Sequence, residues 1–209
     1  MIQPQTRAWW RATLALCLGS FLVFINLYAP QPLLPELRQL YGLSTLAVGL
    51  VMSVATLALA ASLLVFGPLS DAIGRGGIMR LTLLGAGALS LALALAPNFE
   101  TLLALRALQG FVLGGLPAVA IAWMGDEFEP DAMLAAVGLY IGANTLGGIS
   151  GRVVGGGMGE LGGSASGFLA VGLITLAGVA LFWKLLPPSR GFTPRRFELA
   201  GAVAALGAP

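Results

Sequence analysis

The sequence contains no histidine and only one cysteine, Cys17. A single cysteine excludes an internal disulfide, and the absence of histidine and of a cysteine cluster leaves no set of side chains typical of a metal site. Histidine is also the usual base that activates a serine nucleophile. We therefore expect no metal, no cofactor and no catalytic residues.

Charged residues are scarce as well. They make up 10% of the 209 residues, whereas a soluble domain has about 25%. The chain is 57% hydrophobic, with a mean hydropathy of +0.91. Too few charges are present to cover a water-facing surface, and the net charge of +2 is small. These numbers predict an integral membrane protein whose surroundings are the lipid bilayer, with no nucleic-acid partner.

Six apolar runs are long enough to cross a bilayer as helices, which takes about 20 residues each. Short segments rich in glycine, proline or charge separate them and leave no room for a folded soluble domain. The predicted protein is all-α, with an N-terminal segment (1–11), a six-helix unit (12–186) and a truncated final segment (187–209). The runs cover approximately residues 12–33, 45–69, 77–97, 100–124, 132–158 and 165–186.

The basic residues are distributed unevenly between the two sides of the predicted membrane. Arg38 is the only one on the side away from the N-terminus, whereas eight share the side of the N-terminus. By the positive-inside rule, both termini are expected in the cytoplasm, where four tryptophans near helix ends would form an aromatic belt. The eight are Arg7, Arg11, Arg75, Arg80, Lys184, Arg190, Arg195 and Arg196; the tryptophans are Trp9, Trp10, Trp123 and Trp183.

A charged, glycine-rich stretch, GPLSDAIGRGGIMR (residues 67–80), separates the second and third runs. Asp71 and Arg75 are four residues apart, so they can pair on a helix. Gly67 and Gly74 permit close backbone contact and a tight reversal. We also expect Arg75 to lie near an acid of the next loop on the same side, which holds Asp126 and Glu127. The alternative is an ordinary solvated hairpin.

This stretch resembles the signature between helices two and three of the major facilitator superfamily, G-x-x-x-D-R/K-x-G-R-R/K. Gly67, Asp71, Gly74 and Arg75 stand at the matching positions. Ala72 and Gly76 depart from the pattern, because the family prefers basic residues there.

Further matches fall in the first, fourth and fifth runs. The first run closes in LYAPQPLLPEL, like helix one of bacterial efflux members, and LALRALQG resembles the family's L-x-x-R-x-x-Q-G through Leu103, Arg106, Gln109 and Gly110. The fifth run resembles the antiporter signature G-x8-G-x3-G-P-x2-G-G, with Arg152 in place of the proline. Its matching glycines are Gly138, Gly147, Gly151, Gly155 and Gly156.

The resemblance implies a twelve-helix fold in two halves, each made of two inverted three-helix repeats, with the substrate site between the halves. This chain would supply the N-terminal half of an efflux-type transporter of the bacterial inner membrane, working by alternating access on a small molecule. The glycines would pack against the other half. That partner would be a missing C-terminal half or a second copy of this chain.

Polar side chains inside the apolar runs must find partners, and together they predict a substrate or coupling cavity. For Arg106 we favour a position facing that cavity over one in which the side chain reaches the interface. For Arg152 a functional role and simple anchoring stay equally open. The residues of the predicted cavity are Asn26, Gln31, Arg106, Gln109, Tyr140, Asn144 and Arg152.

Two other functions compete with transport. The stretch GISG around Ser150 resembles the motif of intramembrane serine proteases, but the sequence has no histidine to activate the serine, so this function is excluded. An inactive truncated fragment, or a structural membrane module, stays open as the alternative. No acid lies well inside any run, so the coupling ion is not readable from the sequence.

Overall fold

The protein is all-α, as predicted. The structure, a computed structural model, describes residues 1–189 and 191, so most of the predicted final segment (187–209) lies outside the described residues. Within the described part, extended pairing is confined to one isolated bridge between Ile2 and Phe128. The helices are α1 (Arg7–Tyr28), α2 (Leu34–Leu40), α3 (Thr45–Ile73), α4 (Arg75–Leu93), α5 (Phe99–Leu113), α6 (Gly115–Glu127) and α7 (Pro130–Leu185).

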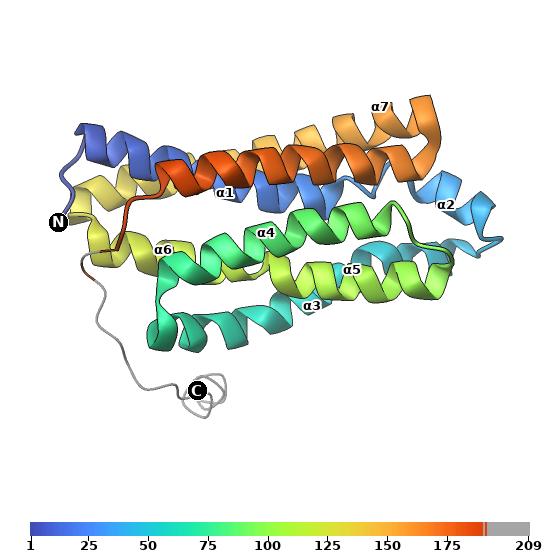
Figure 1. Cartoon of the computed structure of the whole chain (residues 1–209), viewed down its shortest axis with the longest axis horizontal. Helices are drawn as coiled ribbons and strands as arrows, with labels where there is room; N and C mark the ends of the chain where they lie inside the picture. Colours follow the sequence, from blue (N-terminus) through green and yellow to red (C-terminus); the bar gives the residue numbers. More distant parts are fainter. Residues whose placement is uncertain (190, 192–209) are drawn as a thin grey trace.

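Six segments of these helices are long enough to cross a membrane. Five helical stretches are both long and apolar enough: α1, α3, α4, α5 together with α6, and α7. The sixth segment arises because α7 contains two arms. The last stretch, α7, has 56 residues and contains non-helical backbone at Gly162 and Gly163. Gly163 has φ +79°, a conformation that favours glycine. There α7 reverses, so that a first arm (130–161) and a second arm (164–185) run side by side (Figure 1).

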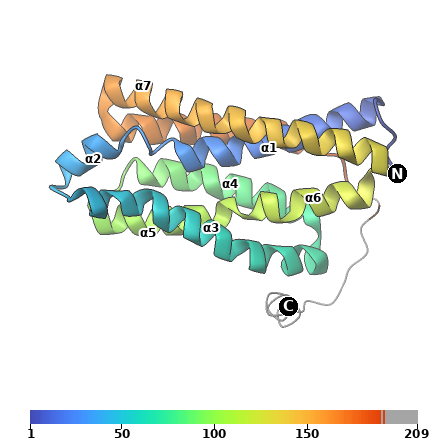
Figure 2. The same ribbon diagram turned by 180° about the vertical axis from the view of Figure 1, so that it is seen from behind.

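The helices form two groups joined by α4. One group is α1 with both arms of α7, and the other is α3 with α5 and α6; α4 contacts both groups. Figures 1 and 2 show the groups as two layers of nearly parallel helices. The N-terminus and the end of α7 meet at one end of the bundle, called the terminal end below. The reversal of α7 lies at the other end, with α2, and is called the turn end.

The tryptophans do not form the predicted belt. Trp10 and Trp183 are about half exposed, but Trp9 and Trp123 are buried in the core. The Trp9 indole Nε1 donates to the carbonyl of Ala132 at 2.9 Å, which joins α1 to the start of α7. The belt prediction is therefore wrong for these two residues, because a position near a helix end does not say which way the ring points.

The glycine stripe packs inside this chain rather than against another half, which corrects the prediction made for it. A Cβ on Gly147 would lie 2.5 Å from the carbonyl oxygen of Phe21, and one on Gly151 would lie 2.6 Å from that of Ile25. Gly155 meets the carbonyl oxygen of Ala29 in the same way. The glycines and the carbonyls both recur every four residues, so the backbones of α1 and α7 approach closely along their length.

Two other glycines of the predicted stripe differ in their surroundings. A Cβ on Gly156 would lie 3.3 Å from the ring of Pro32, a tight contact, whereas one on Gly138 would meet no atom within 4 Å. In the turn, Gly67 also has no atom within 4 Å of an added Cβ, so the predicted close contact there is absent. Gly74, at φ +105°, supports the predicted reversal.

Replacing Gly151 by alanine is expected to destabilise the bundle by about 1–3 kcal/mol, the usual cost of overpacking a tight contact. Gly138→Ala is the matched control on the same arm of α7, because its Cβ enters open space and alanine favours a helix. Unfolding of the purified protein by SDS, followed by circular dichroism, measures both. Equal stability of the two variants would contradict the backbone packing described here.

The expected topology is tested with new cysteines in a Cys17→Ala background. Gln39→Cys lies on α2 at the turn end, and Gly77→Cys begins α4 at the terminal end. In intact bacterial cells an impermeant thiol reagent should label Gln39→Cys, and should label Gly77→Cys only after the membrane is opened. The opposite pattern would reverse the orientation.

Candidate functional site

The guanidinium of Arg106 is fully buried (0% exposed) and joins three helices. From α5 its Nε donates to the carbonyl of Val51 on α3 at 3.2 Å. Its terminal nitrogens donate to the carbonyls of Asn26 and Leu27 on α1 at 3.3 and 3.4 Å. Nη1 also donates to Oε1 of Gln109 at 2.5 Å. Arg106 therefore binds backbone rather than a carboxylate.

The carbonyls on α1 are free to accept because the helix ends there. The usual donor to the Asn26 carbonyl would be residue 30, but this is a proline without an N–H. The N–H of Gln31, the usual donor to Leu27, bonds to the carbonyl of Tyr28 instead. The end of a helix also carries partial negative charge, so a cation is favoured at this place.

Gln109 and Asn26 extend the arrangement into a buried polar network. The amide of Gln109 donates to Oγ of Ser90 on α4 at 2.6 Å and to Oδ1 of Asn26 at 3.3 Å. The Asn26 amide donates to Oγ1 of Thr175, on the second arm of α7, at 2.7 Å. Five helices thus meet in one network, which brings together three of the predicted cavity residues.

Neither sequence interpretation of Arg106 describes its position in this conformation. The side chain does not extend to the membrane interface, and it is inaccessible from outside the bundle. A contact between Arg106 and substrate stays a prediction for a more open conformation. Ser90 and Thr175 escaped the sequence analysis, because a lone hydroxyl in an apolar run usually bonds to its own helix.

The remaining predicted residues form a second cluster on one face of α1 and α7. Asn144 is half-buried and accepts a hydrogen bond from the hydroxyl of Ser20 on α1. Tyr140, one turn away on α7, is buried. The predicted cavity is therefore divided into two separate polar regions, one inside the bundle and one at its surface.

Arg152 and Gln31 belong to this second region. The guanidinium of Arg152 lies over the ring of Tyr28, 4.4 Å from its centroid, and its Nε donates to Oε1 of Gln31 at 2.7 Å. They stand beside a cavity of about 210 Å³ on this face. Its lining residues are Phe24, Tyr28, Asn144, Thr145, Gly148, Ile149 and Arg152. The name "Arg152 cavity" is used for it below.

At the terminal end, Arg75 links the turn to α6, as predicted. Its Nη2 donates to Oδ1 of Asp71 at 3.1 Å, and its Nε lies 2.9 Å from Oδ2 of Asp126. Both pairs are only partly exposed, so water screens them less than it would a surface pair. The Arg75–Asp126 pair ties the α3–α4 turn to the end of α6, and the Asp71–Arg75 pair stabilises the turn itself.

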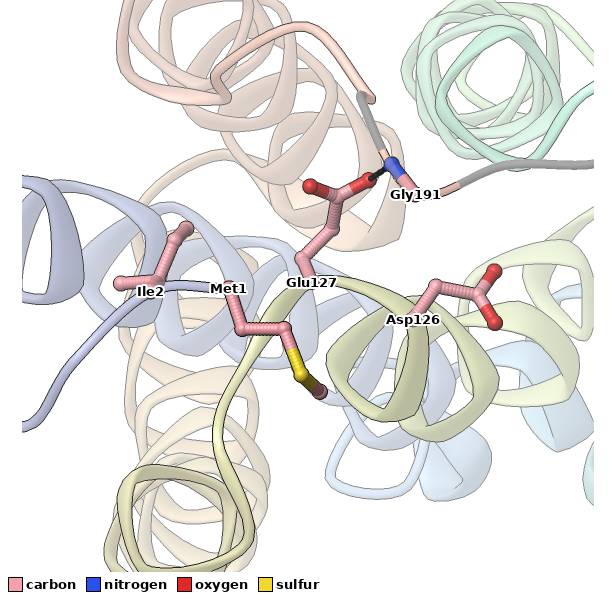
Figure 3. A pocket seen from close by; sticks show the side chains of 5 residues that line it. All are labelled: Met1, Ile2, Asp126, Glu127 and Gly191. Carbon is pink, nitrogen blue, oxygen red and sulfur yellow. Dashed lines mark hydrogen bonds between the residues drawn. The ribbon is translucent and has the colours of Figure 1, made fainter.

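Glu127 faces a different neighbour from Asp126. Its carboxylate accepts from the hydroxyl of Ser189 at 2.6 Å and from the N–H of Gly191 at 2.9 Å. Figure 3 shows Glu127 turned toward Gly191 and Asp126 pointing away from it. The backbone of Ile2 pairs with residues 127 and 129, so the start of the chain, this loop and the end of α7 meet around one small pocket.

Charged side chains also bond to both ends of the second arm of α7 (164–185). At the terminal end, Arg11 donates to the carbonyls of Lys184 and Leu185, and Arg80 donates to that of Leu186. At the turn end, Glu36 accepts from the N–H of Ser164 at 2.7 Å, where the second arm begins. Cations at a helix C-terminus and an anion at an N-terminus both complement the helix dipole.

Comparison with known proteins decides the family. The family model described as Major Facilitator Superfamily matches residues 16–207. The chain belongs to this superfamily. The chain is 41% identical to the uncharacterized MFS-type transporter YybF of Bacillus subtilis over 198 residues. This matched region covers 95% of this chain and 49% of YybF.

The chain is also similar to two other transporters. The chain is 38% identical to the inner membrane transport protein YnfM of Escherichia coli over 92% of its own length and 46% of the relative's. Its fold matches the crystal structure of the human organic anion transporter MFSD10 with a TM-score of 0.70, at 22% identity, over 91% of this chain and 51% of that one. The chain thus spans about half the length of the curated relatives it matches.

The named relatives are described as transporters. Within residues 1–189 and 191, no group of three or more histidine, cysteine, aspartate or glutamate side chains is placed to hold a metal ion. The two regions offer hydrogen-bond donors, acceptors and fixed positive charge, one of them inside the bundle and one at its surface.

Removing the Arg106 guanidinium should destabilise the bundle strongly. Arg106→Met leaves Oε1 of Gln109 and the end of α1 without their donor, which we expect to cost about 1–3 kcal/mol for each buried acceptor left unsatisfied. Arg106→Lys should also destabilise, because one ammonium group cannot reach the acceptors on α1 and α3 together. Arg38→Met, on exposed α2, is the control and should change stability by less than about 0.5 kcal/mol. SDS unfolding that shows Arg106→Met as stable as the parent would contradict this role.

Proposed function

We propose that this chain is the N-terminal half of an efflux-type transporter of a bacterial plasma membrane, with both termini in the cytoplasm. The observation that carries the proposal is the Arg152 cavity, a polar opening on the side of an otherwise apolar bundle in a chain of this superfamily. A cation and amide groups between apolar helices of a membrane protein are costly unless they serve a solute or a partner.

The cavity is smaller than a complete binding site, which supports a two-part arrangement. Its 210 Å³ is below the roughly 300–1,000 Å³ of most ligand pockets. A second six-helix unit facing α1 and the first arm of α7 would supply the missing wall. The substrate would then lie between the two units, as in other transporters built from paired repeats.

In this proposal the solute crosses by alternating access, as the two units rock about the site. The ion pairs of Arg75 hold the turn against α6 at the terminal end. Their rupture and formation would accompany opening and closing on that side. The Arg106 network would keep the six helices of this unit together during the movement, because it ties α1 to four other segments.

The second candidate is a chain that does not transport by itself. Self-pairing through the cavity face would bring two Arg152 guanidiniums together, and among the described residues Arg152 has no ion-pair partner to offset the repulsion. Arg106 does not add to this repulsion, because it is enclosed in its own bundle. We therefore expect the chain alone to be inactive and to need a separate C-terminal half.

Co-expression tests the proposal. The 209-residue chain is produced alone and together with the C-terminal half of YybF, and inside-out vesicles are assayed for uptake of a carboxylate, a sugar and a cationic dye. The two halves should copurify and transport at least one solute, while the chain alone should transport none. Arg75→Gln in the pair should lower the rate, since it removes both ion pairs.

Two results would contradict the proposal. Transport by the chain alone would show that it works without a second half. Copurification without transport of any solute would show that the chain is a structural partner rather than half of a carrier.

A further inference from the structure

Arg152 carries a positive charge that nothing in the described residues neutralises. No carboxylate of residues 1–189 and 191 lies within ion-pair distance of it. The next acid on the same arm, Glu160, is eight residues away, or about 12 Å along a helix. Glu36, at the turn end, is already bonded to the N–H of Ser164. The charge is therefore held at the surface of this six-helix unit without a counter-ion among the described residues.

All the partners of Arg152 are electrically neutral. Nε donates to the Gln31 amide oxygen at 2.7 Å, Nη1 donates to the carbonyl of Gly148 at 3.3 Å, and Cζ of the guanidinium lies 4.4 Å from the centroid of the Tyr28 ring. These contacts fix the position of the group but leave its charge intact. Among the described residues Nη2 has no acceptor, and Nη1 keeps a second N–H. This pair of N–H groups has the spacing that binds a carboxylate through two hydrogen bonds.

The rest of the Arg152 cavity suits an apolar body. The rings of Phe24 and Tyr28 are stacked, with centroids 6.2 Å apart and planes inclined by 24°, and both line the cavity. Ile149 adds an aliphatic wall, and Asn144 and Thr145 add polar atoms. An aromatic wall beside a fixed cation is suited to a small molecule with a charged end and an apolar end.

We propose that the Arg152 cavity binds the carboxylate of a small organic acid with an apolar or aromatic body. Arg152 holds the carboxylate, and the Phe24 ring contacts the body. This inference names the substrate class of the function proposed above and rests on it. The position of Arg152 is where the family signature has a proline, so the site follows from a residue in which this chain departs from its family.

The charge of the solute should decide its binding. A carboxylate replaces the missing counter-ion of Arg152, and charge-assisted hydrogen bonds are stronger than those between neutral groups. A neutral analogue of the same shape lacks that contribution, so it should bind about 10–100 times more weakly. An ammonium analogue would be repelled by the guanidinium.

Equilibrium dialysis of the purified 209-residue chain in nanodiscs tests the site, with radiolabelled benzoate as the probe. Benzyl alcohol and benzylammonium serve as unlabelled competitors. Benzoate should bind, and both competitors should displace it at least tenfold more weakly than unlabelled benzoate does. Absence of benzoate binding, or equal competition by benzyl alcohol, would overturn the proposal.

Substitutions locate the binding to Arg152. Arg152→Gln should weaken benzoate binding at least tenfold without unfolding the protein, because the side chain is exposed. Arg152→Lys should retain part of the affinity, since it keeps the charge but loses the two-pronged contact. Arg38→Gln is the control, an exposed arginine at the turn end that should bind as the parent does. Benzoate binding that survives Arg152→Gln would overturn the site.

The vesicle assay of the paired halves separates this inference from the proposed function. Transport of a sugar or a cationic dye without benzoate binding would support a carrier and overturn the anion site. Benzoate binding by the chain without transport by the pair would support the site and overturn the proposed function.

Discussion

The fold depends on one buried cation at the end of one helix. Arg106 is enclosed by α1, α3 and α5, and its charge is met by backbone carbonyls and an amide rather than by an acid. Burial of this charge without an acid depends on α1 ending next to the guanidinium. Pro30 removes the N–H that would occupy the carbonyl of Asn26 and leaves the negative end of the helix dipole for the guanidinium. The arginine and the proline, far apart in sequence, therefore act as a unit.

On its other side, α1 packs against the glycines of α7 through backbone contacts rather than side chains. Gly147 and Gly151 face the carbonyls of Phe21 and Ile25, so two backbones meet where lipid would gain nothing from a groove. The result is an α1 fixed on one side by polar contacts and on the other by backbone packing. Both contacts need an unobstructed approach, and a single added methyl group would disturb the second one.

The sequence predicted those features that depend on residues close together in the chain. The apolar runs predicted all six crossing segments, and the spacing of Asp71 and Arg75, with the shared side of the loops, predicted the ion pairs that include Asp126. It could not assign partners across helices. A stripe of small residues indicates that some backbone approaches, but not which one, so the partner predicted for Gly151 was wrong. Likewise, nothing near Arg106 in the sequence reveals that α1 presents free carbonyls to it.

The two arginines in the membrane show how surroundings divide one side-chain type between structure and function. Arg106 is buried, and its Nε, Nη1 and Nη2 each donate to at least one acceptor, so it stabilises the bundle. Arg152 is exposed on the cavity face, where its guanidinium lies over the Tyr28 ring and keeps N–H groups without an acceptor among the described residues. In this structure the hydrogen bonds of Arg106 are made within its own chain. Arg152 is fixed in position but not neutralised, so it can still form an ion pair with an anion. The exposed arginine is therefore the one from which selectivity for a solute's charge should come.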